Sequence, residues 1–315
     1  MKVLVTGGAG FIGSHLVERL LADGESVRVL DDFSTGKRDT LSLVSADARP
    51  GRFELLEGSL VDLDTCRRAV EGVDGVLHQA ALPSVPRSVR DPIGSNAANV
   101  DGTLNLLVAA RDAKVRRMVM ASSSSVYGNS PTLPKIETMP TNPRSPYALT
   151  KLAGEVYARL FFELYGLETV CMRYFNVFGP RQDPSSQYAA VIPKFVFALL
   201  DGKAPEIHGD GGQTRDFTFI DNVVDANLRA LGAPKAPGEA MNVAAGSRTS
   251  LLEMLEHIQR ILGTGIAPVH VEARAGDVRD SLADLGKARA LLGYEPGIGL
   301  VEGLERYVAW ARSVR

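Results

Sequence analysis

Thr6-Gly7-Gly8-Ala9-Gly10-Phe11-Ile12-Gly13 joins a β-branched run at residues 3–6 to an amphipathic helical pattern at residues 12–21. Its glycines have the spacing G-x-x-G-x-x-G. Glycines permit a tight turn here and let the backbone approach a pyrophosphate, whose negative charge meets the amides and the positive end of the helix dipole. The segment predicts a strand-turn-helix unit that binds a dinucleotide. A glycine-rich turn without a ligand is the alternative.

Four more apolar, β-branched runs follow along the first half of the chain, at residues 27–30, 53–56, 75–78 and 118–121. Helical patterns separate them, with one apolar face on Leu104, Leu107 and Val108. Strands that alternate with helices form βαβ units, whose sheet is parallel and covered on both faces. The predicted fold class is therefore α/β, with a Rossmann-type doubly wound parallel sheet.

The 315 residues exceed what one hydrophobic core usually organises. After Arg173 the pattern becomes irregular around Gly179, Pro180, Pro184 and Pro193, and helical patterns then return near residues 195–200, 222–231, 251–262 and 301–311. We expect a dinucleotide-binding domain over residues 1–175. Residues 176–315 are expected to form a smaller α/β substrate-binding subdomain, with the chain free to cross back to the sheet.

Charge and composition exclude several classes of protein. The formal net charge is -2 and the basic residues form no long run, which argues against nucleic acid as a partner. No stretch approaches the roughly 20 apolar residues of a membrane span, and the N-terminus lacks the layout of a signal peptide, so we expect a cytoplasmic protein. The two cysteines and five histidines lack metal-ligand spacing, and no metal is predicted.

Asp31 and Asp32 end the second predicted strand, about 20 residues beyond the glycines. A carboxylate at this position can accept hydrogen bonds from the adenosine ribose hydroxyls, and it repels a 2′-phosphate. Asp31 is the better candidate, and NAD is favoured over NADP. Lys37 and Arg38 nearby weaken that preference, and an acidic turn is the alternative interpretation.

Ser145-Pro146-Tyr147-Ala148-Leu149-Thr150-Lys151 predicts the start of a helix, with Ser145 as N-cap and Pro146 in the first turn. Tyr147 and Lys151 then share one helical face. A nearby ammonium and a helix N-terminus both favour a phenolate, so we expect the pKa of Tyr147 to be depressed and the side chain to act as a base. A lone Y-x-x-x-K is more often an ordinary surface helix.

This pair is not alone, because the strand at residues 118–121 runs into Ser122-Ser123-Ser124-Ser125-Val126-Tyr127-Gly128. The serines follow the carboxyl end of a parallel strand, where ligands bind in such folds. We expect one of these hydroxyls to contact a substrate oxygen.

The sequence as a whole resembles the extended short-chain dehydrogenase/reductase family, and within it the UDP-sugar 4-epimerases, in particular those of UDP-N-acetylglucosamine. The resemblance spans essentially the whole chain. It rests on the glycine turn, Leu77-His78-Gln79-Ala80-Ala81, Asn99, the serine run, the Tyr147/Lys151 pair and Arg173-Tyr174-Phe175-Asn176-Val177-Phe178-Gly179-Pro180-Arg181.

The resemblance implies a role for each matching residue. Catalysis falls to Ser123, to Tyr147 as base and to Lys151, which positions the nicotinamide ribose. The implied cofactor-binding residues are Gly7, Gly10, Phe11, Ile12, Gly13, Asp31, Ser59, Leu60, Gln79, Ala80, Ala81, Asn99, Tyr147, Lys151 and Tyr174. The implied substrate-binding residues are Ser84, Ser124, Asn176, Ala190, Val191, Arg215, Arg274, Asp277 and Ser281.

The implied reaction is NAD-dependent C4 epimerisation of a UDP-hexose through a transient 4-keto sugar. Related 4,6-dehydratases carry an Asp-Glu pair where this chain has Ser124 and Ser125, so dehydration is disfavoured. Decarboxylation ranks below epimerisation, because no site for a C6 carboxylate is identified. A UDP-glucose or UDP-glucuronate 4-epimerase and, from another class, a non-catalytic NAD-sensing regulator remain as alternatives.

The expected sugar is an acetylated one. Ser281 stands where enzymes restricted to UDP-glucose and UDP-galactose carry a bulky tyrosine, and Ala190 replaces an asparagine. A small side chain leaves volume for a 2-acetamido group, so UDP-GlcNAc and UDP-GalNAc are the preferred substrates. Ser59 stands where many relatives have an aspartate, and Pro83 replaces a lysine of some epimerases, which predicts weaker cofactor affinity. Relatives commonly form homodimers, here through helices near residues 99–111 and 147–165.

Overall fold

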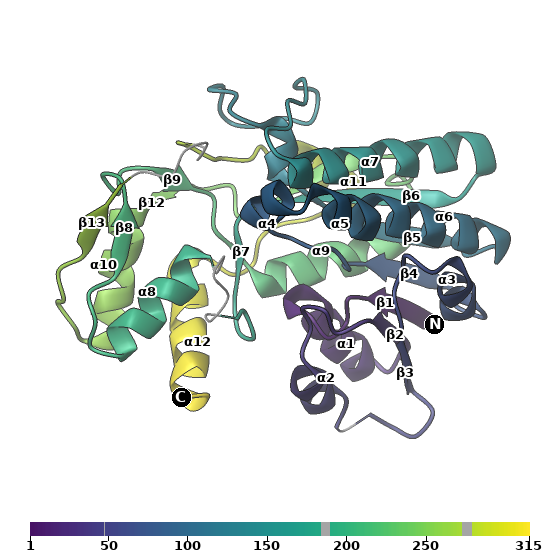
Figure 1. Cartoon of the computed structure of the whole chain (residues 1–315), viewed down its shortest axis with the longest axis horizontal. Helices are drawn as coiled ribbons and strands as arrows, with labels where there is room; N and C mark the ends of the chain where they lie inside the picture. Colours follow the sequence, from purple (N-terminus) through teal and green to yellow (C-terminus); the bar gives the residue numbers. More distant parts are fainter. Residues whose placement is uncertain (47, 184–189, 273–278) are drawn as a thin grey trace.

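A seven-stranded parallel sheet forms the larger part of the protein (Figure 1). The computed structural model describes residues 1–46, 48–183, 190–272 and 279–315. The strand order is β11-β6-β5-β4-β1-β2-β3, and every neighbouring pair is parallel. The strands are β1 Lys2–Thr6, β2 Ser26–Asp31, β3 Phe53–Glu57, β4 Gly75–His78, β5 Arg117–Ser123, β6 Glu168–Tyr174 and β11 Ala240–Val243.

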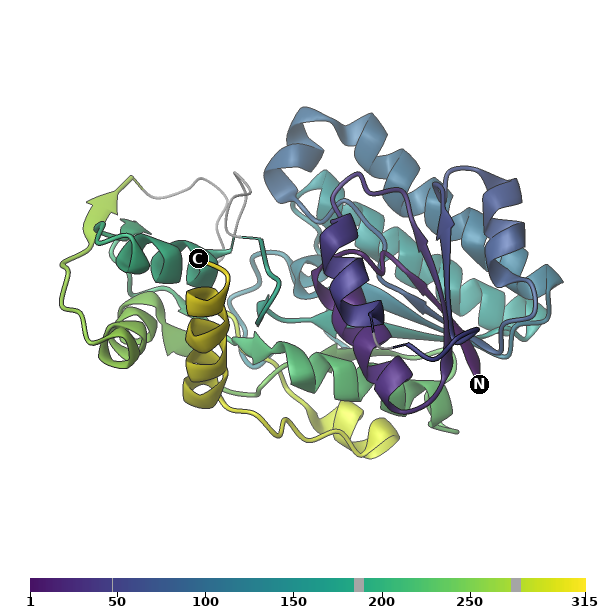
Figure 2. The same cartoon turned by 90° about the horizontal axis from the view of Figure 1, so that it is seen from below.

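Helices cover both faces of this sheet, as Figures 1 and 2 show. Helices α3, α6 and α7 pack on one face, and α1 and α9 pack on the other. The helices of this part are α1 Phe11–Ala22, α2 Arg38–Ser45, α3 Leu63–Val70, α4 Val85–Arg90, α5 Pro92–Asn96, α6 Gly102–Asp112, α7 Pro146–Tyr165, α9 Ile220–Gly232 and α11 Gly286–Leu292, with a π-helical turn at Ala97–Asp101 and a 3-10 turn at Ser124–Tyr127. The predicted doubly wound α/β fold is confirmed.

The strand order reverses between β1 and β4, because the chain winds outward to β3 and then returns to the other side of β1. At such a switch point the loops after neighbouring strands diverge and leave a crevice outside the carboxyl ends of the strands. The glycine turn follows β1 and Gln79 follows β4, so both lie at this crevice. The fold therefore places the predicted dinucleotide site where doubly wound sheets bind ligands.

A smaller lobe lies beside the carboxyl edge of the sheet (Figures 1 and 2). Its strands form short two-stranded sheets, in which β8 pairs with β13, β9 with β12, and β10 with β7. Between these pieces the chain returns to the main sheet, with α9 packed on β5 and β6 and with β11 paired to β6. The elements are β7 Val177–Phe178, α8 Val191–Leu200, β8 Glu206–His208, β9 Thr214–Arg215, β10 Thr218–Phe219, β12 Thr249–Ser250, α10 Leu251–Leu262, β13 Val269–Val271 and α12 Leu300–Ser313.

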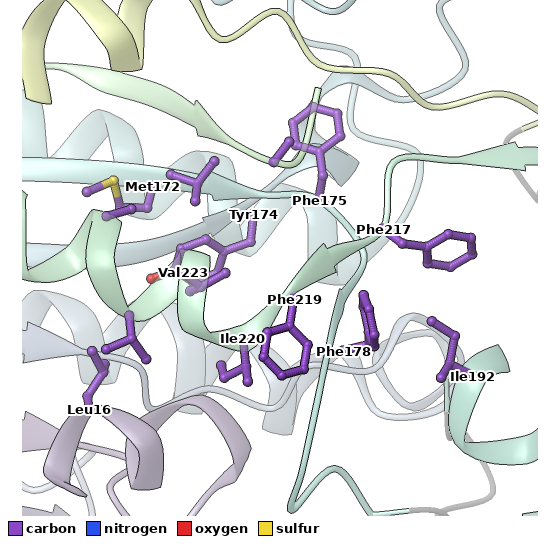
Figure 3. Packing of buried hydrophobic residues seen from close by; sticks show 14 of the residues in the cluster. Leu16, Met172, Tyr174, Phe175, Phe178, Ile192, Phe217, Phe219, Ile220 and Val223 are labelled. Carbon is purple, nitrogen blue, oxygen red and sulfur yellow. The ribbon is translucent and has the colours of Figure 1, made fainter. Parts of the chain in front are cut away.

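One hydrophobic cluster runs from the α1 and α9 face of the sheet into the smaller lobe. Figure 3 shows Leu16, Val223 and Ile220 leading to Phe219 and Phe178 at the junction. The rings of Phe178 and Phe219 meet edge to face, with centroids 5.5 Å apart, which adds a specific geometry to their burial. A continuous apolar core joins the two parts, so the lobe is held in a fixed position over the carboxyl edge of the sheet.

The opposite face of the sheet has a separate cluster, which includes Leu4 of β1 and Leu106 of α6. Val3 and Val5 belong to the first cluster and Leu4 to the second, because successive side chains of a strand point to opposite faces. Within the described residues, none of the helices combines the length and apolar character that a membrane crossing requires.

Candidate active site

A cleft of about 840 Å³ runs along the carboxyl edge of the sheet towards the smaller lobe. Its size falls in the range of ligand and cofactor pockets, about 300–1,000 Å³. Predicted site residues from well-separated segments line it together. They are Gly7, Gly10, Phe11, Ile12, Gly13, Asp31, Ser59, Leu60, Gln79, Ala80, Ala81, Ser84, Ser123, Tyr147, Lys151, Tyr174, Asn176 and Ala190.

The glycine turn has the geometry that a dinucleotide phosphate needs. Gly7 has φ +69°, and a Cβ at Gly13 would lie 2.1 Å from the carbonyl oxygen of Gly7, so a side chain at Gly13 is sterically excluded. Helix α1 begins directly after Gly10, and among the described residues no side chain caps its first amides and its first turn carries no acidic residue. These amides and the positive end of the dipole face the cleft, and they fit an anionic diphosphate.

Asp31 lies at the end of β2 in the wall of the same cleft. Its carboxylate accepts hydrogen bonds from the amides of Ala9, at 2.9 Å, and Phe33, at 2.8 Å. Burial raises the pKa of Asp31, and these two amides oppose the rise. The carboxylate therefore ties the glycine turn to the end of β2 and also presents negative charge where an adenosine ribose would lie.

The two cations near Asp31 are already engaged elsewhere. The Arg38 guanidinium lies 4.0 Å from the centre of the Phe33 ring and forms an ion pair with Glu57 at 2.5 Å. Lys37 lines the cleft and pairs with Asp183 at 3.1 Å. Both cations are thus paired with carboxylates, and the negative charge of Asp31 at the end of β2 disfavours a 2′-phosphate.

The catalytic candidates converge at the start of α7, which begins as the sequence predicts. Ser145 caps the helix by accepting a hydrogen bond from the Ala148 amide at 3.1 Å, and Pro146 is its first residue. The Tyr147 side chain is hydrogen-bonded to Ser123, at the end of β5. The Lys151 ammonium, one turn further along α7, donates to the backbone carbonyl of Ala121 at 2.9 Å. Hydroxyl, phenol and ammonium therefore meet at one point of the cleft wall.

The expected depression of the Tyr147 pKa is wrong. Burial raises the pKa of Tyr147, and the hydrogen bond from Ser123 only partly offsets this effect. Burial also lowers the pKa of Lys151 to about 8. A neighbouring charge and the helix dipole favour the phenolate, but desolvation, which local sequence does not show, disfavours the charged form of both side chains.

Several predicted site residues that the structure describes do not line this cleft. Asn99 accepts from the Leu82 amide at 2.7 Å and donates to Thr150 at 3.1 Å, so it supports the loop after β4 from behind. Val191 packs against the hydrophobic core. Ser124, Arg215 and Ser281 also lie outside the lining, and Arg274 and Asp277 fall outside the described residues.

Arg215 and Ser281 are nevertheless neighbours in the smaller lobe. The Ser281 amide donates to the Thr214 carbonyl at 3.1 Å, and Arg215 donates to the carbonyls of Thr214 and Arg279, both at 3.0 Å. Two substrate candidates that are 66 residues apart in sequence are thus brought together at an isolated bridge between Thr214 and Asp280.

The cleft also contains cations that the sequence analysis did not select. The cations in its lining are Arg87, Arg90, Arg181 and Lys37. Arg181 forms an ion pair with Glu18 of α1 at 2.7 Å. Arg181 ends the segment that carries the resemblance, which was the available signal. For Arg87 and Arg90, the sequence indicates a role in the site only through their position shortly after Ser84, because isolated arginines are usually solvated surface charges.

Comparison with known proteins places these features in one family. Residues 3–244 match the model of the NAD dependent epimerase/dehydratase family. The chain belongs to this family. The predictions of this family, of an enzyme and of NAD as its cofactor are confirmed.

Relatives of this family member match it along its full length. It is 45% identical to a UDP-glucose 4-epimerase of Mycolicibacterium smegmatis, over 99% of both chains. The structure of UDP-N-acetylglucosamine 4-epimerase from Methanobrevibacter ruminantium M1 in complex with UDP-N-acetylmuramic acid has a TM-score of 0.94 and 38% identity, covering 100% of this chain and 99% of that one. The UDP-glucuronic acid 4-epimerase from Bacillus cereus, in complex with UDP-glucuronic acid and NAD, has a TM-score of 0.92 and 32% identity, covering 100% of both chains.

Proposed function

We propose that this enzyme inverts C4 of a UDP-hexose through a 4-keto intermediate, with Ser123, Tyr147 and Lys151 as its catalytic residues. The observation that carries the proposal is the hydrogen bond between Ser123 and Tyr147 beside the Lys151 ammonium, in the same cleft as the glycine turn. Besides a hydride acceptor, oxidation of a secondary alcohol requires a proton acceptor, and it is helped by a hydroxyl that binds the same oxygen and by a nearby positive charge.

In this mechanism Tyr147 removes the proton from the sugar O4, and the Ser123 hydroxyl holds that oxygen in place. The Lys151 ammonium stabilises the phenolate, which burial alone disfavours. The 4-keto sugar then rotates in the cleft and presents the opposite face of C4. Tyr147 returns the proton to O4. No net proton leaves the site, so the tyrosine needs no connection to bulk water during turnover.

Bound NAD would supply a reversible acceptor for the C4 hydride and would be regenerated in every cycle. The residues that would hold it are the glycine turn at the diphosphate, Asp31 at the adenosine ribose and Lys151 at the nicotinamide ribose. Because the cofactor is regenerated, we expect the purified enzyme to retain it. A protein that releases no dinucleotide on denaturation and binds none on titration would contradict this part of the proposal.

We infer that acetylated sugars are accepted, with UDP-GlcNAc and UDP-GalNAc as the preferred pair. Ala190 lines the cleft with a small side chain, and Ser281 is a small residue beside Arg215. A pocket usually rejects a 2-acetamido group by steric exclusion, which two small side chains do not provide. The 45% identity to a UDP-glucose 4-epimerase makes UDP-glucose and UDP-galactose the second candidate pair.

A product assay tests the proposal. The purified enzyme is incubated separately with UDP-GlcNAc, UDP-glucose and UDP-glucuronate, and the sugar products are resolved by chromatography. We expect UDP-GalNAc from UDP-GlcNAc at the highest kcat/KM. NAD binding without a product from any UDP-hexose would instead favour the NAD-sensing regulator.

We also propose that the enzyme works in the cytoplasm as a homodimer joined through α6 and α7. Support comes from the apolar side chains that α7 leaves exposed, Leu149, Val156, Leu164 and Tyr165. Light scattering of the purified protein should give twice the chain mass of 33.7 kDa. Leu149→Glu together with Val156→Glu should yield the monomer, and a wild-type monomer would exclude this arrangement.

A further inference from the structure

A buried ion pair lies directly behind the catalytic candidates, between α7 and the sheet. Arg173 of β6 donates to both oxygens of Glu155 of α7, at 2.9 Å from Nε and 2.7 Å from Nη2, and both side chains are 7% exposed. Removing two charges from water is costly, and apolar residues of similar volume are often as stable. Stability alone is therefore a weak reason for an ion pair at this position.

Glu155 reaches the active site through the end of β5. Its carboxylate also accepts a hydrogen bond from the Ser122 hydroxyl at 2.5 Å. Ser122 stands between Ala121, whose carbonyl accepts from Lys151, and Ser123, which is hydrogen-bonded to Tyr147. Ser122 and Ser123 are consecutive residues at the end of β5, so anchoring Ser122 to Glu155 also holds the backbone that carries Ser123.

Glu155 also lies one helical turn beyond Lys151 on α7, so the two side chains share a helix face. A cavity of about 10 Å³, the size of one water molecule, is lined by both and by His78, Ser122 and Cys171 among others. Burial lowers the pKa of Lys151 to about 8, while Cys171 and Glu155 oppose this effect.

The titratable side chains that face Lys151 come from β6, β4 and α7. On β6, burial raises the pKa of Cys171, so this thiol is neutral near pH 7 and does not there oppose the lowering of the Lys151 pKa, because that effect needs a thiolate. On β4, burial lowers the pKa of His78 to about 3, so the imidazole is neutral as well. On α7, Tyr147 carries no charge until it gives up its proton. Glu155 is then the anion that supports the ammonium, and Arg173 behind it opposes that support.

We propose that Glu155, oriented by Arg173, is a positioning residue of the active site: its carboxylate keeps Lys151 charged and, through Ser122, holds Ala121 and Ser123 at the end of β5 in register with α7. This inference rests on the proposed function for the roles of Ser123 and Lys151. Glu155 itself does not line the main cleft, so it acts through its neighbours and not on the substrate.

The test compares Glu155→Gln with Glu168→Gln in the enzyme with NAD bound. The first substitution keeps an acceptor for Ser122 but removes the charge. Glu168 is the control, because it pairs with buried Arg117 at 2.7 Å across β5 and β6, at the starts of these strands, whereas Arg173 lies near the end of β6. We expect Glu155→Gln to shift the alkaline limb of the kcat profile about one pH unit lower and to reduce kcat about tenfold at pH 8, with the NAD content and the KM largely unchanged. Glu168→Gln should keep the wild-type profile.

A second variant covers a Glu155→Gln protein that fails to fold. Ser122→Ala leaves the ion pair intact and removes its link to β5, so it should lower kcat about threefold to tenfold without moving the alkaline limb. Wild-type kcat in Ser122→Ala would overturn the positioning through β5. A wild-type alkaline limb in Glu155→Gln would overturn the support of the Lys151 charge.

A readout that needs no turnover separates this inference from the proposed function. In protein labelled with ¹³C at lysine Cε, the signal of Lys151 is assigned with Lys151→Met and titrated by NMR. The titration midpoint of Lys151 should lie about one pH unit lower in Glu155→Gln than in the wild type, at a tenfold higher proton concentration. If no UDP-hexose is turned over but this shift is seen, the function fails and the electrostatic role stands. An unshifted midpoint refutes that role whatever the assay shows.

Discussion

Gly13→Ala should disable the cofactor site by a steric clash that the structure quantifies. The added Cβ would lie 2.1 Å from the Gly7 carbonyl oxygen, 2.7 Å from its carbon and 2.8 Å from the Gly8 Cα. Favourable contacts between carbon atoms need about 3.5–4.0 Å, so the turn has to open by about 1 Å. All three are backbone atoms, which cannot rotate away as a side chain would.

The cost should lie at the upper end of the values for overpacking, about 3 kcal/mol of unfolding free energy. Opening the turn also displaces the amides that face the diphosphate. A loss of about 3 kcal/mol in binding corresponds to roughly 100-fold weaker NAD affinity. Urea denaturation and calorimetric titration of the cofactor-free protein with NAD measure the two effects separately.

Gly154→Ala is the matched control, because Gly154 lies inside α7 and its added Cβ would be 3.8 Å from the Met120 methyl group, an ordinary contact. Alanine is a better helix former than glycine, so this variant should gain about 0.5–1 kcal/mol and bind NAD normally. Wild-type NAD affinity in Gly13→Ala would refute the argument that the turn admits only glycine.

Three further outcomes are expected. Tyr147→Phe should retain NAD and its unfolding midpoint but lose about 10²–10⁴-fold in kcat; turnover near the wild-type rate would exclude Tyr147 as the base. Burial lowers the pKa of His15 to about 4 and of His78 to about 3, so below pH ~6.5 the unfolded chain binds protons that the folded chain refuses. The free energy of unfolding should then fall by about 2 kcal/mol per histidine between pH 6.5 and 5, as measured by urea denaturation, and His78→Gln should make this decline shallower. Ser281→Tyr should reduce turnover of UDP-GlcNAc much more than that of UDP-glucose; equal effects on both sugars in the product assay would remove Ser281 from the specificity argument.

Sequence patterns located most of the secondary structure. The run at residues 118–121 became β5, and the N-cap and proline of α7 lie at Ser145 and Pro146, where their local chemistry predicts them. Short strands such as β7, β9, β10 and β12 were not predicted. A strand of two residues is too short to show the alternating hydrophobic pattern of a strand, and each of these strands exists only because a distant partner pairs with it.

The candidate site likewise combines local features, which the sequence predicts, with contacts between distant residues, which it does not. The glycine turn and the Tyr147/Lys151 pair depend on residues within one turn of each other, so their spacing alone indicates their geometry. The Lys37 and Asp183 pair across the cleft joins residues 146 positions apart, and nothing in either local sequence indicates it. Local sequence does not predict the Glu155–Arg173 ion pair either, because the pair forms only when α7 packs against β6 and buries both side chains.

The amino-acid sequence by itself determined the α/β class, the strand-turn-helix unit at Gly7 to Gly13 and the helical face that carries Tyr147 and Lys151. These features follow from backbone sterics and from the 3.6-residue period of a helix, which act between near neighbours in the chain. Only the tertiary structure decided which cations line the cleft, that Asn99 supports it from behind, and that the pKa of Tyr147 rises instead of falling. Desolvation depends on every segment that excludes water from a side chain, and those segments come together only when the chain folds.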